Sequence, residues 1–257
     1  MVAPQLETRD LSIRFGGHQA VDRVSATFHA GTLTAIVGPN GAGKTTYFNL
    51  ISGQLPATTG QVLLGGKDIT RFGAARRTRL GVGRAFQLTN LFPNLSVHEN
   101  VRLAVQARAG GGGNITQRWK SRSDWIDQAD GLLAATRLAD QRNVLALALA
   151  HGDQRKLEVA IMMALEPKVL MFDEPTAGMS VADVPVVLDL IKRLKAEGNR
   201  AILLVEHKME VVRSLADRIV VLHNGRLVAD GRPAEVIGSA IVQQAYLGAA
   251  TGSAGDD

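Results

Sequence analysis

A glycine-rich segment at residues 38–45 has the residue types and the spacing of a phosphate-binding loop. It reads Gly-Pro-Asn-Gly-Ala-Gly-Lys-Thr and lies between an apolar stretch, 32–37, and a helical pattern, 44–53. Glycines let backbone N–H groups surround a phosphate, and a helix N-terminus adds positive partial charge. Lys44 would neutralise the β- and γ-phosphates, and the Thr45 hydroxyl would bind the Mg²⁺ that bridges them. The segment predicts a nucleoside triphosphate site, which kinases, GTPases, helicases and transport ATPases share. The residues expected to contact the nucleotide here are Gly38, Pro39, Asn40, Gly41, Ala42, Gly43, Lys44, Thr45 and Thr46.

Two adjacent acids follow a second apolar stretch further along the chain. Residues 169–172 are Val-Leu-Met-Phe, and Asp173 and Glu174 come directly after them. Ligands of an open α/β sheet bind at the edge where the parallel strands end. Asp173 is therefore expected to reach the Mg²⁺ shell, and Glu174 is expected to polarise a water for in-line attack on the γ-phosphate. Beside a phosphate loop, this pair predicts nucleotide hydrolysis.

The elements that must position these residues follow from the spacing of apolar side chains. Residues 6–15 alternate in part and end at two glycines, which indicates a half-exposed strand and the start of an antiparallel sheet. From about 88 to 165 the pattern is helical, and Ser96 with Glu99 matches a capping box. Beyond it, strand and helix patterns alternate, which predicts a parallel sheet built from βα units. The expected elements there are strand 169–172, helix 181–196, strand 201–205, helix 208–215 and strand 218–222.

Length and composition narrow the class of protein. The chain has 257 residues, enough to bury a sizeable core, and no cysteine, which excludes disulfides and thiolate metal sites. Hydrophobic residues make up 46 %, but no apolar run approaches the roughly 20 residues of a membrane-spanning helix. Residues 1–5 do not resemble the start of a secretory signal. The net charge of +5 suits nucleic acid, anionic lipid or a nucleotide, but aromatic residues are only 4 %, which disfavours a base-stacking surface.

In their order along the chain, these segments resemble the ATP-binding subunit of an ABC transporter over residues 5–248. The resemblance implies an α/β fold of the P-loop NTPase class, an ABC cassette with a parallel-core sheet, an N-terminal antiparallel β subdomain and an inserted α-helical subdomain. The catalytic core would comprise residues 5–87 and 166–248, and the helical subdomain about 88–165. Residues 249–257 are small and polar, and they are expected to be disordered.

The resemblance also gives roles to residues that carry no signal alone. Gln87 matches the glutamine that senses Mg²⁺ and the attacking water. His207, which follows an apolar strand, matches the switch histidine that contacts the γ-phosphate. Phe15 matches the aromatic residue that stacks on adenine, and a packed core phenylalanine is the alternative. The implied catalytic residues are Glu174, His207 and Gln87, and the implied metal ligands are Thr45, Gln87 and Asp173.

Residues 149–156 resemble the family's Leu-Ser-Gly-Gly-Gln signature, with departures. In the family this segment completes the site of a second ATPase subunit, so that ATP is held between two subunits, and residues 177–180 occupy the position between the two halves. Ala150 replaces the serine whose hydroxyl contacts the opposite γ-phosphate, a hydrogen bond worth about 1 kcal/mol. Asp153 stands where glutamine or glutamate is usual. A homodimer and a heterodimer both remain open. The residues implied to contact the partner's nucleotide are Leu149, Ala150, His151, Gly152 and Asp153.

Three segments resemble the ATPases that power uptake of branched-chain amino acids and related small solutes, namely 155–158, 177–179 and 245–248. The resemblance implies ATP and Mg²⁺ as cofactors. It implies as partners a second ABC ATPase subunit, transmembrane permease subunits and, indirectly, an extracytoplasmic solute-binding protein. The expected location is cytoplasmic and peripheral, on the inner face of the cell membrane. The ATPases of lipopolysaccharide exporters are the alternative. An ABC ATPase acting on DNA or ribosomes is disfavoured by the lack of a second cassette, and no nucleic-acid partner is expected.

Basic residues gather in two places outside these motifs, where a solvated face is the first interpretation. The alternative is attraction to anionic headgroups or to an acidic permease loop. The two clusters are Arg71, Arg76, Arg77, Arg79 and Arg84, and Arg118, Lys120 and Arg122.

Overall fold

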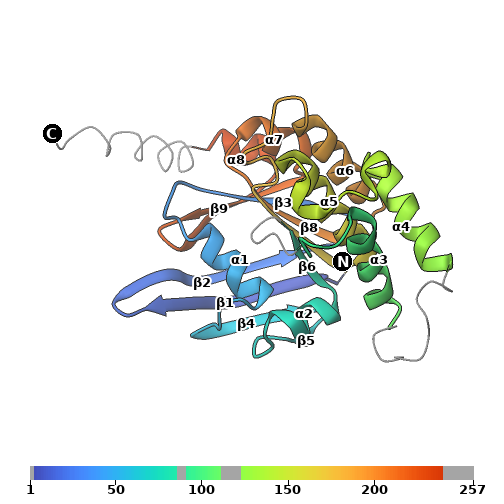
Figure 1. Cartoon of the computed structure of the whole chain (residues 1–257). Coiled ribbons are helices and arrows are strands. Elements are labelled where there is room, and N and C mark those ends of the chain that lie inside the picture. The colour runs from blue at the N-terminus through green and yellow to red at the C-terminus, as the bar shows by residue number, and fades with distance from the viewer. Residues whose placement is uncertain (1–2, 86–90, 111–122, 240–257) are drawn as a thin grey trace. The chain divides into compact units, whose positions relative to one another are not determined.

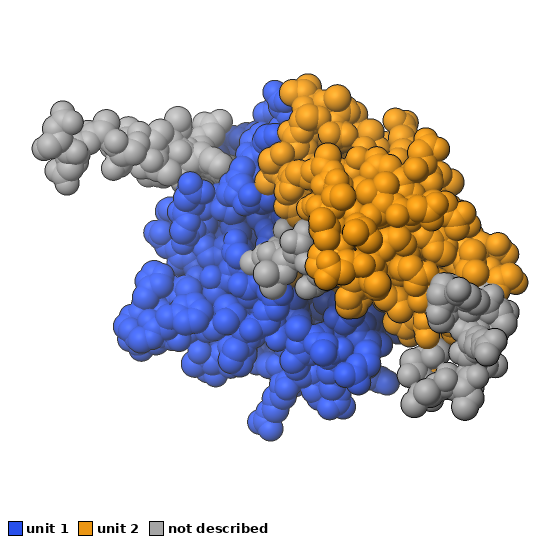
Figure 2. All heavy atoms as spheres, in the orientation of Figure 1, with its two compact units in different colours: residues 1–82, 168–174, 195–257 blue, residues 83–167, 175–194 orange. Residues whose placement is uncertain are grey.

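The computed structural model describes residues 3–85, 91–110 and 123–239 (Figure 1). It divides into two compact units, coloured separately in Figure 2. Unit 1 comprises residues 1–82, 168–174 and 195–257, and unit 2 comprises 83–167 and 175–194. The sequence-based prediction assigns residues 175–194 to the catalytic core. In the structure they belong to unit 2, together with the helical segment. The expected tail, 249–257, lies outside the described residues.

Unit 1 begins with an antiparallel sheet in the strand order β2-β1-β4-β5. The strand predicted over residues 6–15 is confirmed as β1, Leu6–Phe15, and a glycine turn joins it to β2, His18–Phe28. β1 pairs on its other side with β4, Thr59–Leu64, which is followed by the short β5, Lys67–Asp68. The antiparallel subdomain expected at the N-terminus is therefore present.

A second sheet has the strand order β10-β9-β3-β8-β7-β6. Its centre is parallel, as predicted: β3 pairs with β8 and β9, and β7 pairs with β8. Every residue of β3, β7 and β8 is buried, which explains why these strands are continuous apolar runs in the sequence. β10 runs antiparallel to β9 at one edge. The strands are β3 Leu33–Val37, β6 Val82–Ala85, β7 Val169–Asp173, β8 Ala201–Val205, β9 Arg218–His223 and β10 Arg226–Gly231.

Two hydrophobic clusters use opposite faces of β3, because successive side chains of a strand point to opposite sides. Ile36 belongs to the larger cluster, which contains the buried side chains of α1, Lys44–Ser52. Ala35 and Val37 belong to a smaller cluster with α7, Met209–Leu215, and α8, Pro233–Ile237. The phosphate-loop helix is thereby fixed on one face of the strand that precedes it.

Unit 2 is mainly helical. Its elements are α3 Val97–Arg108, α4 Ser123–Ala135, the 3₁₀ turns η3 Ala139–Gln141 and η4 Ala146–Ala148, α5 His151–Leu165 and most of α6 Val184–Ala196. A core of its own includes Val101, Trp125, Leu133 and Leu157. The Ser96 half of the predicted capping box is confirmed: the Ser96 Oγ accepts a hydrogen bond from the backbone N of Glu99 at 3.1 Å. The Glu99 carboxylate binds Arg102.

The structure corrects two sequence interpretations. α6 begins at Val184 rather than at residue 181, because Ser180 and Asp183 form a turn in which the Ser180 Oγ accepts from the Asp183 backbone N. Val181 is 91 % exposed. Arg77, counted with a solvated basic cluster, is only 1 % exposed and lies in α2, Ala74–Leu80. The second basic cluster lies outside the described residues.

The buried guanidinium of Arg77 joins α2 to the end of α1. It donates to the carbonyl oxygens of Leu50 and Ile51, both at 2.6 Å, and to those of Thr70 and Phe72 at 2.7 and 2.8 Å. The first two carbonyls belong to the last turn of α1, where the helix dipole favours a cation. Burial lowers the pKa of Arg77 to about 10, which leaves it charged at neutral pH. The side chain therefore caps the helix that carries the phosphate loop.

We predict that Arg77→Met lowers the free energy of unfolding by about 3 kcal/mol or more, because it leaves buried carbonyls without a donor. Arg77→Lys should lose less, since the ammonium keeps the charge and three donors. Urea unfolding measures both. Arg79→Met is the matched control, because Arg79 is exposed on the same helix and its loss should stay within about 0.5 kcal/mol. Equal losses for Arg77→Met and Arg79→Met would contradict the capping role.

Candidate functional site

The phosphate loop is shaped by glycines with other backbone pressed against them. Gly38 has φ of 153°, and a Cβ there would lie 2.1 Å from the carbonyl oxygen of Leu222. Gly43 is the N-cap of α1 with φ of 95°, and a Cβ there would lie 2.5 Å from the carbonyl oxygen of Ala20. A side chain at either position would displace the loop. The loop thus turns from β3 into α1, and the first N–H groups of that helix have no partner within the helix.

Lys44 is the buried cation of the loop. Its Nζ donates to the carbonyl oxygens of Gly38 at 2.7 Å and Pro39 at 2.9 Å, so the side chain folds back along the loop. Burial lowers its pKa, and the carboxylates of Glu174 and Asp173 oppose that shift. Both acids are therefore close enough to act electrostatically on the ammonium.

The acidic pair occupies the carboxyl end of β7, as predicted. Asp173 is the last residue of the strand and is buried. Glu174 follows with φ of 51°, a left-handed conformation that is uncommon for glutamate, and its backbone N donates to the Val205 carbonyl. Sparsely populated conformations persist where surrounding contacts determine them and are found at functional sites.

Glu174 contacts the histidine that the sequence predicts for the same site. His207 Nε2 lies 2.7 Å from Glu174 Oε1, and their side chains are 42 % and 40 % exposed. His207 follows β8, which is paired in parallel with β7, so the two residues come from neighbouring strand ends. Its own backbone N donates to the Glu206 carboxylate at 2.8 Å. A carboxylate and an imidazole in contact can together position and polarise a water.

Lys44, Glu174 and His207 line a cavity of about 450 Å³ within unit 1. This volume lies in the range of about 300–1,000 Å³ that small-molecule sites occupy. Phe15 borders it and is 48 % exposed, so the alternative of a packed core phenylalanine is excluded. His18 and Ala20, which no sequence pattern singled out, also line it because the β1–β2 turn brings them there. The predicted site residues that line it are Phe15, Asn40, Gly41, Ala42, Gly43, Lys44, Thr45, Thr46, Glu174 and His207.

The other predicted site residues fall elsewhere. Gly38 and Pro39 accept hydrogen bonds from Lys44 but do not line the cavity, and the buried Asp173 does not line it either. Gln87 lies outside the described residues. Thr45 and Asp173 offer hydroxyl and carboxylate oxygens, the hard ligands that Mg²⁺ prefers. Within the described ranges, no group of three or more histidine and acidic side chains could hold a metal ion by itself.

The signature segment belongs to unit 2, where it forms the first turn of α5. Ala150 is the N-cap and supplies no side-chain hydrogen bond. Gly152 is buried, and a Cβ there would lie 2.7 Å from Asp183 Oδ2. Asp153 Oδ1 binds Lys156 Nζ at 2.8 Å, and Lys156 also pairs with Asp183 at 3.1 Å. The start of α5 is thus held against the turn before α6.

Hydrogen bonds and ion pairs shift the pKa values of the charged side chains in this network. Burial alone lowers the pKa of Lys156, but the hydrogen bonds that its ammonium donates to Asp153 and Asp183 outweigh burial, and the net shift is upward. The pKa of Asp183 is lowered by hydrogen bonds from Ser180 and Lys156. Gln141 from η3 completes the network by donating to Asp153 Oδ2 at 2.8 Å. Sequence reasoning missed Gln141, Lys156 and Asp183, since only their contacts give them a role.

Comparison with known proteins identifies the family of this chain. The family model described as "ABC transporter" matches residues 21–177. The high-affinity branched-chain amino acid transport ATP-binding protein LivG of Escherichia coli K12 is 36 % identical over 255 residues, which cover 97 % of this chain and all of that protein. BraF of Pseudomonas aeruginosa, described in the same words, is 36 % identical over 256 residues, with the same coverage.

Comparison with solved structures also finds ATP-binding cassettes of ABC transporters. The ADP conformation of an ATP-binding cassette of an ABC transporter superposes with a TM-score of 0.81 at 27 % identity, covering 96 % of this chain and 100 % of that one. A nucleotide-free cassette superposes with a TM-score of 0.80 at 27 % identity, covering 95 % and 98 %. The described helices include none that is long and apolar enough to cross a membrane. On both sequence and fold, the chain belongs to the ABC transporter family and is one of its nucleotide-binding, ATP-hydrolysing cassettes.

Proposed function

We propose that this cassette powers an importer of branched-chain amino acids or related small solutes. The catalytic part of the proposal is carried by the Glu174–His207 contact in the cavity lined by the phosphate loop. The transport part is supported by relatives that match over nearly the whole chain and are named for branched-chain amino acid transport. The comparisons give no support to the lipopolysaccharide-exporter alternative.

The predicted site residues divide the tasks of ATP binding and hydrolysis among them. The exposed ring of Phe15 stacks on adenine, while the N–H groups of the loop and Lys44 hold the β- and γ-phosphates. Thr45 and Asp173 would hold Mg²⁺, with Gln87 as a further ligand, and the ion would neutralise charge on the phosphates. Glu174 orients the attacking water and accepts its proton, and His207 contacts the γ-phosphate and keeps Glu174 in position.

The complete assembly requires other chains. Unit 1 acts as the catalytic core and unit 2 as the helical subdomain, whose signature turn at residues 149–153 completes the nucleotide site of a second ABC ATPase subunit. Membrane permease subunits receive the motion, and a solute-binding protein outside the membrane delivers the cargo. The cassette accordingly works at the inner face of the cell membrane. Closure of the dimer on ATP and opening after hydrolysis supply the stroke.

We predict that Glu174→Gln binds ATP but loses at least about a hundredfold of the hydrolysis rate, because the amide cannot accept the proton of the attacking water. Lys44→Ala should instead abolish ATP binding, because the phosphates lose their buried cation. A fluorescent ATP analogue measures binding, and phosphate release by the assembled dimer measures turnover. Glu197→Gln is the control, since this exposed acid pairs with Arg200 away from the cavity. Unchanged turnover in Glu174→Gln would refute its role as base.

Restoring the missing hydroxyl tests the signature turn. Ala150→Ser should tighten ATP-driven dimerisation about fivefold, because serine adds one hydrogen bond to the opposite phosphate. It should also stabilise α5 by about 1 kcal/mol, since serine is a good N-cap where alanine is a poor one. Sedimentation with ATP and urea unfolding separate the two effects. Increased stability with unchanged dimer affinity would show that the hydroxyl acts on the helix alone.

Transport itself is tested in cells whose only copy is the native chain or Glu174→Gln. Uptake of labelled leucine should fall in the variant, because solute entry requires hydrolysis. A panel of small amides and urea, measured in parallel, covers the related solutes. Unaffected uptake of every solute together with a damaged cell envelope would overturn import and favour export.

A further inference from the structure

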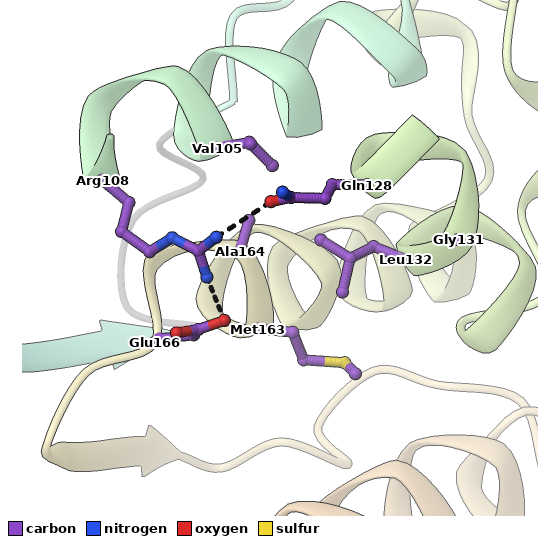
Figure 3. A pocket seen from close by; sticks show the side chains of 8 residues that line it. All are labelled: Val105, Arg108, Gln128, Gly131, Leu132, Met163, Ala164 and Glu166. Carbon is purple, nitrogen blue, oxygen red and sulfur yellow. Dashed lines mark hydrogen bonds and ion pairs between the residues drawn. The ribbon is translucent and has the colours of Figure 1, made fainter. Parts of the chain in front are cut away.

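A second cavity lies entirely within unit 2, between the ends of α3 and α5 and the middle of α4 (Figure 3). Its volume is about 390 Å³, which falls in the range of small-molecule sites. None of its lining residues belongs to the nucleotide cavity or to the signature turn. The proposed mechanism of ATP hydrolysis therefore does not use this cavity.

One wall of this cavity is aliphatic. Val105 of α3, Leu132 of α4 and Met163 and Ala164 of α5 supply it, and Figure 3 shows them around the same hollow. Methionine adapts its shape to an apolar partner more readily than a branched side chain does. A short branched or linear hydrocarbon chain is the group that this wall would exclude from water.

The rim carries one cation and one anion. Arg108, at the end of α3, donates from Nη2 to Gln128 Oε1 at 2.9 Å and forms an ion pair with Glu166 (Figure 3). A guanidinium has five N–H donors, so it can hold a further carboxylate beside these two acceptors. The Glu166 side chain is 58 % exposed and can accept from an ammonium group.

Two residues at this rim are unusual for their positions. Gly131 lies inside α4, where a glycine weakens a helix, yet no described atom lies within 4 Å of where its Cβ would be. Glu166 caps α5 with φ of 45°, a position that glycine usually occupies. Packing within the described part of the chain explains neither choice. Gly131 leaves space on its side of the cavity, and Glu166 places an acid at the cavity's edge.

We propose that this cavity binds a free α-amino acid with an aliphatic side chain. Its carboxylate would lie on Arg108, its ammonium on Glu166, and its side chain on the wall formed by Val105, Leu132 and Met163. A polyanion such as a nucleotide would be repelled by Glu166, and a simple cation by Arg108. Only a ligand with both charges on one small head group and an apolar tail satisfies the rim and the wall together.

Such a site goes beyond the proposed function and does not depend on it. The cavity is built on the last turn of α5, whose first turn is the signature segment, and it also contacts α3 and α4. A bound amino acid would therefore bridge three helices of unit 2. This would give the cassette a sensor for an amino acid on its own side of the membrane.

Binding is tested by calorimetry on the full chain without nucleotide, with leucine added to about 10 mM. Leucine should bind, and leucinamide, which lacks the carboxylate, and 4-methylpentanoate, which lacks the ammonium, should each bind about tenfold more weakly. Arg108→Gln should weaken leucine but not leucinamide, and Glu166→Gln should weaken leucine but not 4-methylpentanoate. Each variant then removes only the contact that its matched ligand cannot make.

Two controls protect this result. Arg193→Gln removes an exposed arginine of α6 that pairs with Asp189, and it should leave leucine binding unchanged. Binding of the fluorescent ATP analogue to every variant shows that the chain is folded. It also separates this test from the proposed function, because leucine binding without ATP binding would contradict only the proposed function.

The position of the ligand can be read from ¹³C-methyl methionine spectra, because the chain has only six methionines and Met163 lines the cavity. Leucine should shift the Met163 signal and leave that of the fully buried Met171 unchanged. No leucine binding at 10 mM, equal binding of all three ligands, or an effect of Arg193→Gln equal to that of Arg108→Gln would each overturn the proposal.

Discussion

Parallel pairing of three buried strands is the constraint on which the catalytic site depends. β8 lies between β3 and β7 with its residues in register with both, so the three strands end at one edge of the sheet. The phosphate loop follows β3, Glu174 follows β7 and His207 comes shortly after β8. Segments that are far apart in sequence are therefore brought to the same edge of the sheet by strand pairing. The hydrophobic burial of these strands holds the chemistry in position.

Within that frame, the site is made by backbone geometry and by one buried cation. Close approach of the Leu222 and Ala20 carbonyls to two glycines fixes the loop, and Lys44 is held inside it by two carbonyl oxygens. The backbone of the loop is therefore shaped before phosphate arrives, whereas Lys44 must exchange carbonyl contacts for phosphate oxygens. The capping of α1 by Arg77 supports the same helix from its other end. Both ends of the helix are thus determined by polar contacts.

The sequence predicts best those elements whose apolar pattern is clear, and the half-buried β1 also has the predicted bounds. β8 has the predicted bounds, and β3 and α1 differ by one residue, because continuous apolar runs and flanking glycines mark them. β5 escaped prediction because it has only two residues, and β10 because it is incompletely buried at a sheet edge, where no apolar run is required. The loop and the acids could be found from their spacing, and the histidine could be found only from the resemblance to the family. His18, Lys156 and Asp183 could not, since their roles arise from contacts between separate segments.

The contact between Gly152 and Asp183 has a consequence for how such chains diverge. The signature glycine is enclosed by the carboxylate of Asp183, which in turn neutralises Lys156. A methyl group at residue 152 would need a shorter side chain at residue 183, and that change would leave the lysine ammonium with one acid fewer. The three positions form a unit that tolerates joint replacement better than single replacement. In related chains we therefore expect residues 152, 156 and 183 to be kept together or replaced together, so that residue 183 covaries with the signature turn.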